Sequence, residues 1–187
     1  MKNITMKTLG SRDVLIHPEE FNDIELDSPA LALFTDYKTH KPLEIEADTP
    51  AVQAQYLMRK AHVHLKLVVD NQQDLIGIIS INELEDQNLL VLQNRGLDRK
   101  QILVSDLMVP REKINSLDFK QLSNCSVADL IATLQLNRAQ HCVIVDQDTH
   151  HIRGVVSVAD IARRLHIAIK VESPVKSFAD IFITVNS

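Results

Sequence analysis

The sequence is poor in the residue types that mark several common protein classes. Its 187 residues include no tryptophan, two cysteines and four glycines, and only 4% are aromatic. Cys125 and Cys142 are too few for a disulfide framework and suit a reducing compartment. Cys142 begins an apolar run, so we interpret it as a small buried hydrophobic residue. A disulfide-stabilised secreted domain is therefore not expected.

Long apolar segments and basic clusters are missing as well. The longest largely apolar run, residues 75–81, has the length of a strand, whereas a membrane span needs about 18 residues. Residues 1–7 lack the apolar centre of a signal peptide. The net charge of −5 gives no general attraction to nucleic acid or anionic lipid. We expect a cytoplasmic protein with no membrane span and no nucleic-acid partner.

The sequence also lacks the motifs of common enzymes. It contains no P-loop, no C-x-x-C, no H-E-x-x-H and no nucleophile elbow. Asp146 and Asp148 lie in a polar turn, and the neighbouring His150 and His151 have no third ligand placed by spacing. We therefore predict neither catalytic residues nor a metal site.

What the sequence does contain is a tandem repeat. Residues 152–161 read as a short apolar strand, a serine that can cap a helix, and an acidic residue one turn later. Residues 75–84 repeat this phrase, and Gly154 follows Gly77 by 77 positions. Because the chain has only four glycines, two at matched places indicate duplication.

Hydrophobic periodicity predicts the order strand, helix, strand, strand, helix in each copy. A copy of 60 to 70 residues would have a marginal core, so the two should pack sheet against sheet about a pseudo-twofold axis. The predicted fold class is α+β, with an N-terminal arm at 1–28, repeats at 29–100 and 101–170, and a tail at 171–187. In the first copy we expect a strand at 42–46, a helix at 51–60, strands at 65–69 and 75–79, and a helix from Ser80. In the second we expect a short strand within 109–119, a helix capped by Ser126, strands at 141–145 and 152–156, and a helix from Ser157.

This order, together with the phrase Gly-apolar-apolar-Ser-x-x-Asp, resembles the cystathionine-β-synthase (CBS) domain. Two copies form a Bateman module, and residues 104–110 are similar to the segment that precedes a CBS repeat. The resemblance covers residues 31–169, although only the second copy keeps the aspartate. It implies a stand-alone regulatory sensor that requires no cofactor and binds AMP, ADP, ATP or S-adenosylmethionine between the repeats. It further implies a homodimer that signals to an effector protein.

The candidate ligand site centres on Asp160, whose carboxylate could accept hydrogen bonds from two ribose hydroxyls. Ser157 opens the same helix, where free N–H groups favour a phosphate, and Val155 could line an apolar slot for adenine. The resemblance adds His141 as a phosphate contact. It implies a facing wall made of Thr39, Leu43, Val63 and His64.

A weaker second site is expected in the other cleft. Its residues would be Ile78, Ser80 and Glu83, faced by Ala139 and Gln140. The extra methylene of glutamate moves the carboxylate outward by roughly 1.5 Å, which is enough to spoil a bidentate ribose contact. We expect this site to be empty or altered.

A structural alternative stays open. Ser157 and Asp160 also fit a helix capping box, which would explain both residues without a ligand. Arg163 and Arg164 then read as a solvated helix face, and the apolar stretch 181–185 as a contact for association. Under this alternative the protein is a ligand-free dimerisation or scaffold module.

Overall fold

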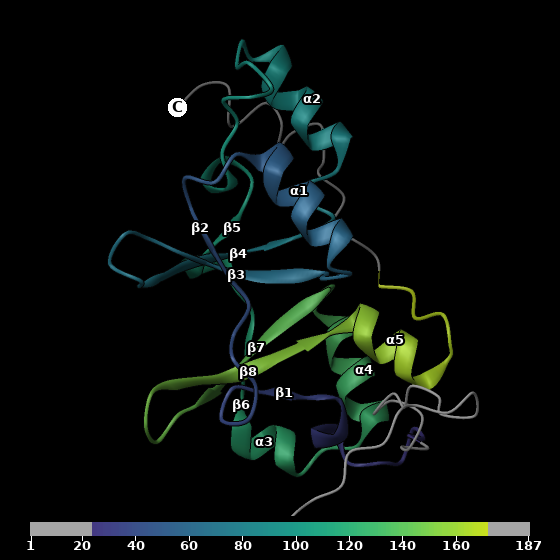
Figure 1. Cartoon of the computed structure of the whole chain (residues 1–187). Coiled ribbons are helices and arrows are strands. Elements are labelled where there is room, and N and C mark those ends of the chain that lie inside the picture. Colours follow the sequence, from purple (N-terminus) through teal and green to yellow (C-terminus); the bar gives the residue numbers. More distant parts are fainter. Residues whose placement is uncertain (1–23, 172–187) are drawn as a thin grey trace, which may run out of the picture.

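The computed structural model describes residues 24–171, and most of the expected arm and tail (1–23 and 172–187) lie outside the described residues. Two four-stranded mixed sheets face each other, with helices on their outer sides (Figure 1). Each half follows the order strand, helix, strand, strand, helix, as predicted. The fold is therefore α+β, with two repeats about a pseudo-twofold axis.

The first sheet has the strand order β2-β3-β4-β5, and β2 runs parallel to β3. Helices α1 and α2 lie on its outer face (Figure 1). Its elements are β2 (Glu44–Glu46), α1 (Ala51–Lys60), β3 (Leu65–Val69), β4 (Leu75–Ser80), α2 (Asp86–Asn94), the 3₁₀ turn Val104–Asp106 and β5 (Val109–Pro110).

The second sheet has the order β1-β8-β7-β6, and β6 runs parallel to β7. One short helix, α3, has no counterpart in the first repeat. The elements are the 3₁₀ turn Ala30–Leu33, β1 (Thr35–Asp36), the 3₁₀ turn Arg111–Lys113, β6 (Ser116–Asp118), α3 (Phe119–Ser123), α4 (Val127–Leu136), β7 (His141–Asp146), β8 (His151–Ser157) and α5 (Val158–Leu165).

The repeats exchange their lead-in strands. β1 is the first strand of the first repeat but pairs with β8 of the second, and β5 is the first strand of the second repeat but pairs with β4 of the first. Asp36 on β1 accepts two hydrogen bonds from Arg153 on β8, at 2.9 and 2.8 Å. The Arg153 guanidinium also lies 4.2 Å from the centre of the Phe119 ring. Each sheet is thus completed by a strand from the other side of the chain.

The repeated glycines lie where these exchanged strands cross. Gly154 pairs with Asp36, and a Cβ there would overlap the carbonyl oxygen of Thr35. Gly77 pairs with Pro110, and a Cβ there would lie 2.8 Å from the Val109 carbonyl oxygen. Such close backbone approach requires glycine, which accounts for the matched pair in the sequence.

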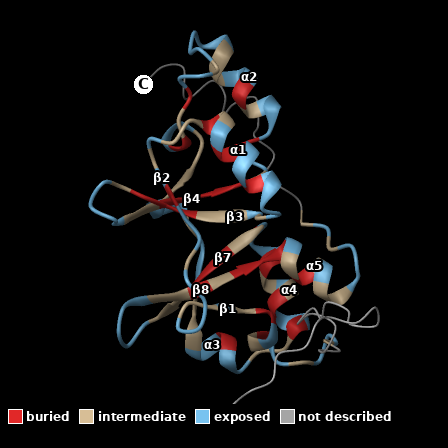
Figure 2. Ribbon diagram, viewed as in Figure 1, coloured by how far each residue is buried: buried red, intermediate tan, exposed pale blue. Residues whose placement is uncertain are grey.

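Two hydrophobic cores lie between helices and sheets, where the buried residues concentrate (Figure 2). The first packs Met58 and Ile79 together, and the second packs Leu134 and Ile144. Cys142 is buried in the second, as predicted. No helix within residues 24–171 is long and apolar enough to cross a membrane.

Helix α1 and strand β3 have the predicted bounds, but the helix predicted from Ser80 is wrong. Residues 81–85 form a turn, and α2 begins only at Asp86. The Glu83 carboxylate folds back and accepts hydrogen bonds from the Ser80 N–H, at 2.8 Å, and from the Ser80 hydroxyl. Gln55 of α1 donates to the Leu84 carbonyl at 2.6 Å, so this carbonyl is bonded to a side chain instead of a helical turn.

Candidate functional site

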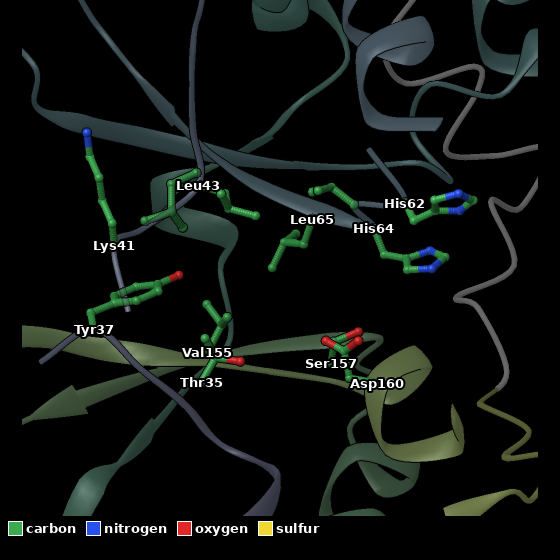
Figure 3. A pocket seen from close by; sticks show the side chains of 12 residues that line it. Thr35, Tyr37, Lys41, Leu43, His62, His64, Leu65, Val155, Ser157 and Asp160 are labelled. Carbon is green, nitrogen blue, oxygen red and sulfur yellow. The ribbon is translucent and has the colours of Figure 1, made fainter. Parts of the chain in front are cut away.

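A pocket of about 170 Å³ lies between the repeats. Its walls come from the segment after β1, the approach to β3, and the junction of β8 with α5 (Figure 3). Strand exchange builds it, because β1 places first-repeat residues beside β8. The lining residues are Thr35, Tyr37, Lys41, Leu43, His62, Val63, His64, Leu65, Leu67, Val155, Ser157 and Asp160.

The pocket has an apolar centre and two polar ends. Figure 3 shows Leu43, Leu65 and Val155 in the centre, with Tyr37 and Lys41 at one end. At the other end lie Ser157 and Asp160 from the second repeat, opposite His62 and His64 from the first. This layout suits an elongated ligand with an apolar planar part and a polar or charged part.

Tyr37 contributes a neutral phenol to one end. Burial, together with the nearby Glu44 carboxylate, raises the pKa of Tyr37 to about 12. The phenol keeps its proton throughout the physiological range and can donate a hydrogen bond to a ligand acceptor.

The structure brings six of the eight residues predicted for the main site to this pocket. These are Leu43, Val63, His64, Val155, Ser157 and Asp160. Thr39 is not among the lining residues; it lies in the exposed turn after β1, where its hydroxyl donates to the Asp36 carbonyl at 3.1 Å. His141 also does not line the pocket, but it pairs with Ser157 across β7 and β8.

Sequence reasoning missed the other six lining residues, which are Thr35, Tyr37, Lys41, His62, Leu65 and Leu67. The pairing of β1 with β8, with Thr35 opposite Val155, brings the Tyr37 segment to the pocket. A two-residue strand leaves no periodic pattern to detect. His62 has a positive φ of 52° just after α1, and its position next but one to His64 was the available signal.

Ser157 does not form the capping box that the structural alternative required. Its side chain makes no cap hydrogen bond to α5, and its hydroxyl, in a residue 3% exposed, has no hydrogen-bond partner within the described chain. The Asp160 carboxylate instead lies 3.3 Å from the Arg163 guanidinium. The start of α5 therefore carries a buried hydroxyl without a partner in the described chain and, one turn later, a carboxylate paired with Arg163.

In two other places in the chain, a serine forms a side-chain hydrogen bond with the acidic residue three positions later. Ser126 and Asp129 form a complete capping box on α4, with the hydroxyl donating to the carboxylate at 2.7 Å. Ser80 likewise donates to Glu83. Of these three serines, only Ser157 has a hydroxyl without a hydrogen-bond partner in the described part of the chain.

In the second predicted site, the polar side chains are bonded to the protein. Ile78, Ser80 and Ala139 are buried, and the Glu83 carboxylate is bonded to Ser80. The Gln140 amide donates to the Val171 carbonyl at 3.1 Å, so its polar side chain is bonded too. The groups that would contact a ligand here are bonded to the protein itself.

His141 is a half-buried histidine whose two ring nitrogens are shielded from solvent. Neither ring nitrogen has a hydrogen-bond partner within residues 24–171. Burial lowers the pKa of His141 below its ordinary value; the Glu83 and Asp160 carboxylates oppose this effect, and His64 adds to it. The imidazole is accordingly neutral near pH 7.

No group of three or more metal-ligating side chains occurs in the described part of the chain. His150 lies in the β7–β8 turn with a positive φ of 55°, and His151 begins β8. Arg164, predicted to be solvated, donates to the Ala32 carbonyl and so ties α5 to the 3₁₀ turn before β1.

Comparison with known proteins finds one matching sequence family and several solved structures with a similar fold. The CBS domain sequence model matches residues 34–86. An uncharacterized conserved protein from Pyrococcus horikoshii superposes with a TM-score of 0.55 at 15% identity, covering 80% of this chain and all of the other. The structure of CBSX2 in complex with AMP superposes with a TM-score of 0.50 at 19% identity, covering 73% of this chain and 94% of the other. A CBS-domain containing protein from Agrobacterium tumefaciens superposes with a TM-score of 0.50 at 15% identity, covering 66% of this chain and 84% of the other. No curated protein matches the sequence significantly.

Residues 34–86 match the CBS domain, and the described chain has the fold of a tandem CBS pair. The sequence match lies in the first repeat, and the second repeat has the same element order and the same glycine–serine–acid phrase. Its structural relatives are tandem CBS proteins, as predicted. At these identities the likeness to solved structures establishes the fold and does not identify a ligand.

Proposed function

We propose that this CBS pair is a non-enzymatic regulatory module that binds an adenosine-containing ligand, such as AMP, ADP, ATP or S-adenosylmethionine, between its repeats. The observation that carries the proposal is the buried Ser157 hydroxyl, which has no hydrogen-bond partner among residues 24–171 and lines the pocket beside Asp160. An unsatisfied buried polar group costs about 1–3 kcal/mol. A ligand oxygen at this position would remove that cost.

The chemistry of the pocket matches the parts of such a ligand. The apolar centre, with Leu43, Leu65 and Val155, can hold a purine ring. The Asp160 carboxylate can accept hydrogen bonds from ribose hydroxyls. The N-terminus of α5 and the imidazole of His64 can hold a phosphate. CBSX2, a structural neighbour in complex with AMP, supports this assignment.

A ligand that contacts both repeats can change their relative orientation, because it prefers one arrangement over another. We propose that an effector protein responds to this change and that the module acts as a homodimer. In support of the dimer, the two helices on the outer face of the first sheet, α1 and α2 (Figure 1), carry exposed large apolar residues. These are Tyr56, Leu57, Leu90 and Val91.

Isothermal titration calorimetry with AMP, ADP, ATP and S-adenosylmethionine tests the ligand. Asp160→Ala should weaken binding roughly 10- to 150-fold, since a hydrogen bond to a charged group contributes about 1.5–3 kcal/mol. Glu83→Ala is the matched control at the equivalent position and should change the affinity less than about threefold. No heat with any of the four compounds at millimolar concentration would reject the proposal.

The scaffold alternative is favoured by one observation: Ser80 with Glu83 and Ser126 with Asp129 use the same motif for structure alone. Thermal unfolding separates the two functions. A specific ligand at about 100 times its Kd adds about 2.7 kcal/mol to the free energy of unfolding, whereas a scaffold shows no change.

A further inference from the structure

The two repeats place one histidine each at the same position. His141 follows His64 by 77 residues, the spacing that also relates the repeated glycines. His64 directly precedes β3, and His141 is the first residue of β7. The two histidines are therefore related by the pseudo-twofold axis, with His64 at the start of β3 and His141 at the start of β7.

His141 lies directly beside the partnerless serine. It pairs with Ser157 in the antiparallel ladder of β7 and β8. Side chains of directly opposed residues lie on the same face of a sheet, with Cβ atoms about 5 Å apart. Both imidazole nitrogens and the Ser157 hydroxyl are buried without hydrogen-bond partners in the described residues. The Ser157 side chain lines the pocket, and the His141 imidazole lies beside it on the same face of the sheet, outside the pocket lining.

Charged groups approach this imidazole from both repeats. Asp160 on α5 and Glu83 in the turn after β4 act on it with negative charge, and His64 acts from the approach to β3. Asp160 is itself paired with Arg163 on α5. In the free protein these carboxylates do not outweigh the loss of solvent, because burial is the largest influence on the pKa of His141 and lowers it.

An anionic ligand would change this balance. A phosphate at the start of α5 adds negative charge next to the His141–Ser157 pair and supplies oxygens that accept hydrogen bonds. A charged imidazole has two N–H donors, whereas the neutral ring has one donor and one acceptor. The protonated form therefore gains more from the ligand than the neutral form does.

We propose that His141 takes up a proton when a phosphate-bearing ligand binds, so that the module's affinity for such ligands rises as the pH falls. This inference rests on the proposed function, because it concerns the same pocket. The proton comes from the solvent, and no covalent bond is made or broken. Linkage limits the gain to about tenfold in affinity for each pH unit.

The test compares AMP with adenosine, which has the same base and ribose but no phosphate. Each is titrated into the full chain at about pH 6.5, a region where histidine protonation is sensitive to its surroundings. Two buffers with different ionisation enthalpies are used, so that the buffer-dependent heat counts the protons taken up. We expect net proton uptake with AMP and none with adenosine.

His141→Gln is the matched variant, because glutamine keeps a polar side chain that does not titrate in this range. The phosphate of AMP itself titrates near pH 6, and its contribution is the same in the variant and the native chain. The difference between them belongs to His141. We expect AMP still to bind the variant, with the extra proton uptake lost.

A second measurement does not depend on a variant. Nitrogen-15 chemical shifts of the His141 ring should report a neutral imidazole in the free protein and a charged one with AMP bound. If AMP and adenosine bind with equal proton uptake, or if the ring stays neutral in the complex, the proton linkage is wrong while the proposed function stands. If no adenosine compound binds at all, both are wrong.

Discussion

Replacing Ser157 with alanine should stabilise the free protein and weaken ligand binding at the same time. The hydroxyl is buried, with 3% of the residue exposed, and has no hydrogen-bond partner in the described chain. Removing an unsatisfied buried polar group recovers about 1–3 kcal/mol of unfolding free energy. For a protein of this size, each kcal/mol raises the melting temperature by about 2–4 °C.

Ser80→Ala is the matched control at the equivalent position of the first repeat. Ser80 is equally buried, at 2% exposed, but its hydroxyl donates to Glu83 and accepts from the Asn82 N–H at 3.2 Å. Its loss leaves these partners unsatisfied and should cost about 1–3 kcal/mol. The two chemically identical substitutions should therefore change stability in opposite directions.

Urea unfolding of both variants measures this difference, provided that the slope against urea concentration is unchanged. The midpoint should rise for Ser157→Ala and fall for Ser80→Ala, and only Ser157→Ala should weaken the binding of AMP. If both variants lose stability to the same extent, the Ser157 hydroxyl is satisfied in the free protein. The main support for a ligand at this position would then be lost.

Three further predictions concern the fold and its pH dependence. Arg153→Met should cost about 1.5–3 kcal/mol in urea unfolding, because it leaves the Asp36 carboxylate, 25% exposed, without its guanidinium partner. Arg153 holds the pKa of Asp36 below its ordinary value. The stabilisation by this pair should therefore be present at neutral pH and should disappear as the pH falls through that lowered pKa. An Arg153→Met variant as stable as the native chain would contradict the role of the pair. Gly154→Ala should destabilise the protein more than Gly96→Ala does. Gly96 has a φ of +95° but open space around it, so its replacement should cost about 1–2 kcal/mol. Equal melting temperatures for the two variants would refute the close-approach argument. Because burial lowers the pKa of His141, the unfolded chain binds its proton first, so stability should fall as the pH drops below about 6.5; the loss should be smaller in His141→Gln when unfolding is measured on both sides of that pH.

The repeat and most of the regular elements could be predicted because their signals are local. Matched glycines and the 3.6-residue or two-residue periodicities depend on near neighbours, and they gave the bounds of α1 and β3 correctly. The helix predicted from Ser80 failed for a tertiary reason. Its start is held as a turn by Glu83 and by the amide of Gln55, which is 29 residues from the carbonyl it contacts.

The residues of the candidate site likewise fall into those with a local sequence signal and those that depend on tertiary contacts. Ser157 and Asp160 were found from a local phrase, and the structure places both at the pocket. Tyr37 and Lys41 were missed because their contribution depends on pairing between segments more than 100 residues apart. The sequence also could not decide whether each S-x-x-acid motif closes on itself, since that depends on side-chain contacts after folding. The open motif at Ser157 is the one that favours a ligand.

The crossing of β1 and β5 means that neither half of this molecule is a self-sufficient unit. A fragment ending before residue 101 would carry β1 with no sheet to join and would leave β4 with an unpaired edge. The complementary fragment would expose β8 in the same way. Division of the gene at the repeat boundary should therefore yield two incomplete, aggregation-prone polypeptides that fold only when they are mixed.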